Sequence, residues 1–264
     1  MTGGVAGPRR LVLQALLAAG TVLVLYSPGC HGGPPAVVAD PNALLRAMSD
    51  RLAAARTLSF STSEVHERRR GLGKLEVRLS REWLVRRPDR IVFKVAGGES
   101  DASGTYDGSS LTLLWPVQGV YAQVEMPPTI DQMLDRLAEH FRMPLPVADL
   151  LYSLPYDRLL GQGSGSRYDG RDVVRGVACH HLAYLDPQVD WHVWIPAEGD
   201  PLPRELDITS KGRLGHLTSH VQFNGWDLAA TVPPGAFSPD IPKGYERVRV
   251  VVYPTPRASS AGDH

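Results

Sequence analysis

Cysteine is scarce in this chain, and neither sign of charge dominates it. Only Cys30 and Cys179 occur among 264 residues, so no disulfide framework is expected once an N-terminal leader carrying Cys30 is lipidated or removed. The 28 basic and 28 acidic residues give a formal net charge of zero, which excludes the strong basic bias of a typical nucleic-acid-binding protein. The hydrolase motifs G-x-S-x-G and H-E-x-x-H are also absent. The apolar fraction of 43% is ordinary for a globular protein with a buried core.

Long apolar runs are rare as well, and the one at residues 11–26 follows Arg9 and Arg10. A basic start, an apolar middle and a small-residue end are typical of a secretory signal peptide. At ~1.5 Å per residue a helix over this run would be about 24 Å long, short of a ~30 Å hydrocarbon core. Pro28 then ends any helix. We therefore expect residues 1–30 to direct export.

The end of this leader resembles a bacterial lipoprotein signal, in which a small residue such as Gly29 precedes a lipidated cysteine. The resemblance implies lipidation at Cys30 and a membrane anchor; ordinary cleaved secretion is the alternative. Residues 31–40 are rich in glycine and proline, and predict a flexible tether in either case. Localisation in the periplasm or cell envelope follows from both alternatives.

Periodicity divides the rest of the chain into a helix, a run of strands, a helical insert and a second run of strands. Residues 41–57 repeat apolar residues at helical spacing behind a capping Asp40. About six alternating strands follow, with a hairpin loop expected at 66–74. Residues 129–160 return to helical spacing, with one helix beginning at Thr129 and a second helix over Val147–Leu154. Later strands are predicted at 167–173, 176–185, 190–196, 203–210 and 216–223.

This order predicts an α+β domain over residues 41–253, followed by a polar tail at 254–264. An antiparallel sheet of about eleven strands tends to curl, because each strand is twisted relative to the next. We expect a strongly curved, half-open β-barrel with the N-terminal helix and the helical insert packed in its concave face.

Several short segments resemble known envelope proteins. Arg87–Arg90 before a strand, Tyr106–Gly108 before the next, and the strand-turn-strand beginning at Trp194–Gly199 resemble the LolA/LolB class of lipoprotein-localisation proteins. More narrowly, Gly176–Leu182 together with Asp190-Trp191 resembles DUF2092, a family of predicted periplasmic proteins. The resemblance covers most of residues 42–250 and implies an apolar cavity that shelters acyl chains, with no catalytic residues.

Apolar residues on one face of several strands and of the insert are the candidates for lining such a cavity. They are Leu75, Val77, Leu79, Ile91, Phe93, Val95, Leu111, Leu113, Met133, Leu137 and Phe141. The predicted function is non-catalytic binding of a hydrophobic ligand, a lipid or acyl chain. The alternative is that these residues fill a closed core, in a structural or sensory module that binds an envelope protein partner.

Histidines near the second cysteine are the remaining candidates for chemistry: Cys179, His180, His181, His192, His216 and His220. Adjacent residues on a strand point to opposite faces, so His180 and His181 do not share an ion. Cys179 is predicted to be a small buried hydrophobe. An enzyme using Cys179 is the weakest alternative, and no metal or cofactor is predicted.

Overall fold

The computed structural model describes residues 39–71, 73–97, 101–141, 147–160, 165–212 and 215–250, without the side chain of Phe141. The predicted leader, Cys30, almost all of the tether and the polar tail lie outside the described residues. In the described part, no helix is long and apolar enough to cross a membrane.

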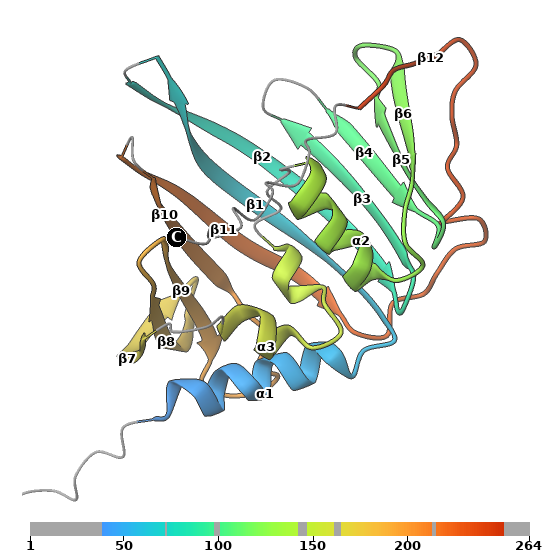
Figure 1. Cartoon of the computed structure of the whole chain (residues 1–264). Helices are drawn as coiled ribbons and strands as arrows, with labels where there is room; N and C mark the ends of the chain where they lie inside the picture. Colours follow the sequence, from blue (N-terminus) through green and yellow to red (C-terminus); the bar gives the residue numbers. More distant parts are fainter. Residues whose placement is uncertain are drawn as a thin grey trace, which may run out of the picture. The chain divides into compact units, whose positions relative to one another are not determined.

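One sheet of twelve strands forms the domain, in the order β12-β6-β5-β4-β3-β2-β1-β11-β10-β9-β8-β7 (Figure 1). All neighbours are antiparallel except β12 and β6. The strands are β1 (Thr57–Arg70), β2 (Gly73–Arg86), β3 (Arg90–Gly97), β4 (Ala102–Tyr106), β5 (Ser110–Trp115), β6 (Val120–Glu125), β7 (Gly165–Val174), β8 (Val177–Leu185), β9 (Val189–Pro196), β10 (Glu205–Gly212), β11 (Gly215–Asp227) and β12 (Glu246–Arg247). The predicted α+β half-open barrel is confirmed.

The longest hairpin corrects the prediction of a loop at residues 66–74. β1 and β2 stay paired as far as Arg70 opposite Gly73, so most of the predicted loop belongs to the two strands. Lys74 Nζ donates to Glu67 Oε2 at 2.8 Å across the hairpin. The charged residues suggested a loop, whereas cross-strand pairing accommodates them because both faces of the hairpin end are exposed.

Helix α1 (Pro41–Ala53) begins as predicted and ends earlier than expected. The Asp40 side chain accepts a hydrogen bond from Asn42 N at 2.9 Å, which caps the first turn. Leu45, Met48 and Leu52 lie on its buried face. The predicted end at residue 57 is wrong, because Thr57 already pairs with Arg86 as the first residue of β1.

The insert contains α2 (Ile130–Arg136), a π turn η1 (Leu137–Phe141), a 3-10 turn η2 (Ala148–Leu150) and α3 (Pro155–Leu160). Thr129 caps α2, as expected. The predicted second helix over 147–154 is a single 3-10 turn, and α3 begins only at Pro155. The residue before a proline avoids helical backbone, so Pro155 starts a new helix rather than extending the turn.

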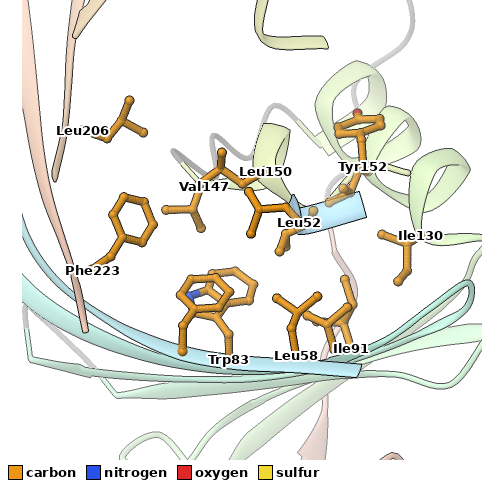
Figure 2. Packing of buried hydrophobic residues seen from close by; sticks show 14 of the residues in the cluster. Leu52, Leu58, Trp83, Ile91, Ile130, Val147, Leu150, Tyr152, Leu206 and Phe223 are labelled. Carbon is orange, nitrogen blue, oxygen red and sulfur yellow. The ribbon is translucent and has the colours of Figure 1, made fainter. Parts of the chain in front are cut away.

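The helices lie over one face of the curved sheet, which we call the inner face and define by Leu58, Trp83 and Ile91 (Figures 1 and 2). These three side chains share a buried cluster with Leu52 of α1 and Leu150 of the insert. The opposite side of the sheet is the outer face. Because strand side chains alternate, the register assigns every strand residue to one face or the other.

Gly104 of β4 has no side chain, and the ring of Phe93 occupies the space where one would lie. A Cβ at this position would lie 2.3 Å from two ring atoms of Phe93 and 3.1 Å from Leu113 Cδ2. Gly104→Ala is therefore expected to lower the free energy of unfolding by about 1–3 kcal/mol, the usual range for overpacking. Urea denaturation measures this change. A loss below about 0.5 kcal/mol would contradict the close packing, because surface substitutions have effects of that size.

Candidate functional site

The predicted lining residues of the sheet lie together on the inner face. Val95 of β3 pairs with Arg81, Phe93 with Trp83, and Leu113 of β5 with Gly104. Six of the eleven candidates are members of the buried cluster: Ile91, Phe93, Leu111, Leu113, Met133 and Leu137. Of the others, Val77 is buried, Val95 packs against the cluster, Leu75 and Leu79 are half-exposed, and the Phe141 side chain lies outside the described residues.

An ionic network occupies the same face beside these apolar residues. Thr62, Glu64 and His66 of β1 follow Leu58 and Phe60 in the inward register, and Arg81 of β2 pairs with Thr62. The Glu64 carboxylate interacts with Arg81 Nη1 and accepts hydrogen bonds from Thr62 Oγ1 at 2.5 Å and His66 Nε2 at 2.6 Å. His66 Nδ1 lies 2.9 Å from Ser219 Oγ of β11. The network therefore links three neighbouring strands.

Burial makes this network energetically demanding. Glu64 is only 2% exposed, and burial alone raises the pKa of its carboxyl group. The hydrogen bond from His66, the charge and hydrogen bond of Arg81, and the hydroxyl of Thr62 outweigh this effect and hold the pKa of Glu64 below its usual value. Glu64 is therefore an anion that Arg81 neutralises inside the fold.

Two buried nitrogen donors, one in this ion pair and one next to it on β2, have no hydrogen-bond acceptor among the described residues. They are Arg81 Nε and Trp83 Nε1, two positions apart on the inward side of β2. Trp83 is 3% exposed, lies in the apolar cluster (Figure 2), and has its ring centroid 5.2 Å from that of Phe93. A buried donor without an acceptor costs about 1–3 kcal/mol, so each of these two groups calls for an explanation.

Sequence reasoning missed this polar group. The signal was present in β1, where Thr62, Glu64 and His66 continue the alternation that begins with Leu58 and Phe60. The loop expected at residues 66–74 hid the fact that His66 continues the inward-facing register of β1.

Depressions in the described part of the chain also occur away from the helices. One, of about 510 Å³, is bordered by Leu84, Val92 and Pro233, and none of the eleven predicted residues lines it. Another, of about 620 Å³, is bordered mostly by outer-face residues, among them Ser63, Val65 and Ser80. Burial itself divides the predicted sheet residues between a packed core around Ile91 and Phe93 and a more accessible end at Leu75 and Leu79.

The second cysteine and its neighbouring histidines are distributed as the strand geometry predicts. Cys179 is buried, and burial raises the pKa of its thiol, so it is a hydrophobe as predicted. His180 bonds Tyr168, whereas His181 points to the other face and approaches His192. Burial, followed by the proximity of His192, lowers the pKa of His181.

Residues 42–251 match the sequence family described as predicted periplasmic proteins, DUF2092. The chain belongs to this family. The match confirms the resemblance read from the Gly176–Leu182 segment and is consistent with an exported protein. No curated protein matches the sequence.

Several solved structures align with this DUF2092 chain. LprF from Mycobacterium bovis aligns with a TM-score of 0.39 and 13% identity over 73% of this chain and 95% of its own. A LolA superfamily protein from Nitrosomonas europaea aligns with a TM-score of 0.34 and 9% identity over 76% and 98%. The MucA/MucB complex from Pseudomonas aeruginosa aligns with a TM-score of 0.39 and 14% identity over 75% and 60%. These likenesses are too distant to assign a ligand or partner.

Proposed function

We propose that this DUF2092 protein is an exported envelope protein that binds an amphipathic lipid on its inner face without catalysis. The observation that carries the proposal is the pair of buried donors, Arg81 Nε and Trp83 Nε1, in apolar surroundings. Oxygens of a lipid ester or carboxylate group would serve as acceptors for these donors. Binding would then supply acceptors that the described residues do not provide.

The acyl chain would lie over the apolar residues that surround Arg81 in the sheet. Val95 pairs directly with Arg81, and Leu79 and Trp83 are its same-face neighbours on β2. Each buried CH₂ contributes ~0.8 kcal/mol, so a short part of one chain is enough for useful affinity. The more deeply packed candidates, such as Ile91 and Phe93, would form the rigid base of this surface.

Native mass spectrometry of the full chain, exported to a bacterial periplasm with Cys30→Ser, tests this function. We expect a mass excess that disappears on denaturation and extracts as lipid. Trp83→Phe removes the donor and keeps an aromatic ring, so it should weaken lipid binding about 2–10-fold, the effect of one hydrogen bond. Trp194→Phe, on the outer face, is the matched control and should bind like wild type.

A bare protein mass that is unchanged after incubation with phospholipid would contradict lipid binding. That result would favour the second function, a module with a filled core that binds an envelope protein partner. The packing of Ile91, Phe93 and Leu113 within the buried cluster is the observation that supports this second function.

We also propose that residues 1–30 form a lipoprotein signal and that Cys30 anchors the domain to a membrane. Metabolic labelling with a fatty-acid analogue should tag the wild type and leave Cys30→Ala untagged. Cys179→Ala is the matched control, because the other cysteine is buried, and it should be labelled like wild type. Equal labelling of Cys30→Ala and wild type would rule out this anchor.

A further inference from the structure

Three adjacent strands bring two histidines and an aspartate together on the outer face. His181 of β8 pairs with Trp194, and His192 of β9 is the diagonal neighbour of His181 on the same face. His181 Nε2 lies 2.9 Å from His192 Nδ1. One carboxylate oxygen of Asp169 completes a group whose three atoms all lie within 4.8 Å of one another.

A bulge in β7 explains how Asp169 reaches this group. The β7–β8 register shifts between Tyr168, which pairs with Leu182, and Gly170, which pairs with His181. Gly170 has a φ of 103°, a left-handed conformation that residues with a side chain disfavour and that the bulge requires. Bulges re-aim side chains in this way and are common beside functional sites.

A supporting residue orients His181. Asp172 Oδ2 lies 3.0 Å from His181 Nδ1 and also accepts a 2.8 Å hydrogen bond from Trp194 Nε1. The Trp194 ring stacks on His181 with centroids 4.3 Å apart. A proton on Nδ1 directed at Asp172 leaves the Nε2 lone pair directed at His192. A carboxylate behind a histidine is the usual outer shell of a metal-binding imidazole.

We propose that His181 Nε2, His192 Nδ1 and a carboxylate oxygen of Asp169 bind a divalent transition-metal ion of the zinc class. Imidazole nitrogens favour Zn²⁺ over the hard ions Mg²⁺ and Ca²⁺. With bonds of about 2.1 Å, tetrahedral ligand atoms lie about 3.4 Å apart. The two nitrogens must separate by about half an ångström and Asp169 must move inward, both within the reach of side-chain rotation.

The charge around Asp169 and the number of protein ligands determine how this site would hold a metal ion. Asp169 already binds a cation, the Arg167 guanidinium, whose Nη2 lies 2.8 Å from Oδ2, and its carboxylate has further lone pairs available for a metal. Three protein ligands leave at least one coordination position open for water or for a donor atom of a partner. The site lies on the outer face, so its occupancy is independent of lipid binding on the inner face.

Calorimetric titration of the full chain, exported with Cys30→Ser, measures the binding of Zn²⁺ in a chelator-free buffer at neutral pH. We expect one Zn²⁺ per chain, no binding of Mg²⁺, and a rise in Tm that EDTA reverses. His192→Gln and Asp169→Asn should each weaken Zn²⁺ binding at least tenfold. Asp172→Asn removes only the orienting carboxylate and should weaken it about 10–100-fold.

His220→Gln is the matched control, because His220 is paired with Asp207 and lies outside the proposed ligand set. It should bind Zn²⁺ like wild type. The proposal is overturned if wild type binds no stoichiometric Zn²⁺, or if His192→Gln and His220→Gln weaken binding equally. Because His192 is only half-buried, its variant should keep the metal-free Tm and isolate the metal effect.

Discussion

Glu64→Gln is expected to lower the free energy of unfolding by about 3–5 kcal/mol, because it leaves the Arg81 charge buried without its counter-ion. The Glu64 side chain is fully buried, and that of Arg81 is 11% exposed. Glutamine keeps the size of the side chain and removes its charge. Urea denaturation compared with wild type measures the loss. A change below about 1 kcal/mol would show that water screens the pair.

The matched variant replaces both charges, Glu64→Leu with Arg81→Leu. Removing a buried ion pair as a unit is often neutral or stabilising, so its stability should stay within about 1 kcal/mol of wild type or rise above it. Lipid binding should nevertheless weaken, since the Arg81 donor is gone. A stable double variant that binds lipid like wild type would remove Arg81 from the proposed site.

Lowering the pH should affect the stability of the wild type and of the Glu64→Leu/Arg81→Leu variant differently. A carboxyl group whose pKa is lowered on folding stabilises the fold above its unfolded pKa and loses this contribution as pH falls through the folded value. The pKa of Glu64 is lowered from 4.5. The wild type should therefore lose stability below about pH 4.5 more steeply than the double leucine variant. Parallel pH profiles would contradict the direction assigned to Glu64.

Most of the fold could be predicted from the sequence, because inward-facing apolar residues alternate with outward-facing polar residues along many of the strands. Leu75, Val77 and Leu79 indicated β2, and five of the six strands after the insert, β7 to β11, were predicted to within a few residues. The short β12 (Glu246–Arg247) was not predicted. Strand β4 carries no such pattern, since Ala-Ser-Gly-Thr-Tyr shows no apolar alternation. Its central residue, Gly104, is there because Phe93 covers it, a tertiary reason that a local pattern does not contain.

The candidate sites were harder to predict, because each depends on the pairing register between neighbouring strands. Glu64 and Arg81 are 17 residues apart, and only the β1–β2 register brings them together. His181 and His180 were correctly separated by strand geometry, but the partner of His181 is on the next strand, and Asp169 reaches both through a bulge. Bulges and diagonal neighbours leave no regular spacing for sequence analysis to detect.

Phe93→Ala is expected to lower the free energy of unfolding by about 3–5 kcal/mol, since it leaves a cavity against Trp83 that no nearby side chain fills. The residue that pairs with Phe93 on β4 is Gly104, which has no side chain to fill this cavity. Leu79→Ala is the comparison on the same face. Leu79 is half-exposed, so we expect a smaller loss of stability together with weaker lipid binding. Equal losses of stability would mean that Leu79 also belongs to the packed core.

Combining Phe93→Ala with Gly104→Ala tests this packing directly. In the wild type the added methyl collides with the Phe93 ring, whereas in Phe93→Ala it enters the space that the ring has left. The two substitutions should therefore be non-additive, with a favourable coupling of about 0.5–3 kcal/mol measured by a double-mutant cycle in urea. Simple additivity would mean that the ring and Gly104 are not in contact. A measured coupling would establish that Phe93 is a fixed part of the inner face, and a lipid would then bind over this residue without displacing it.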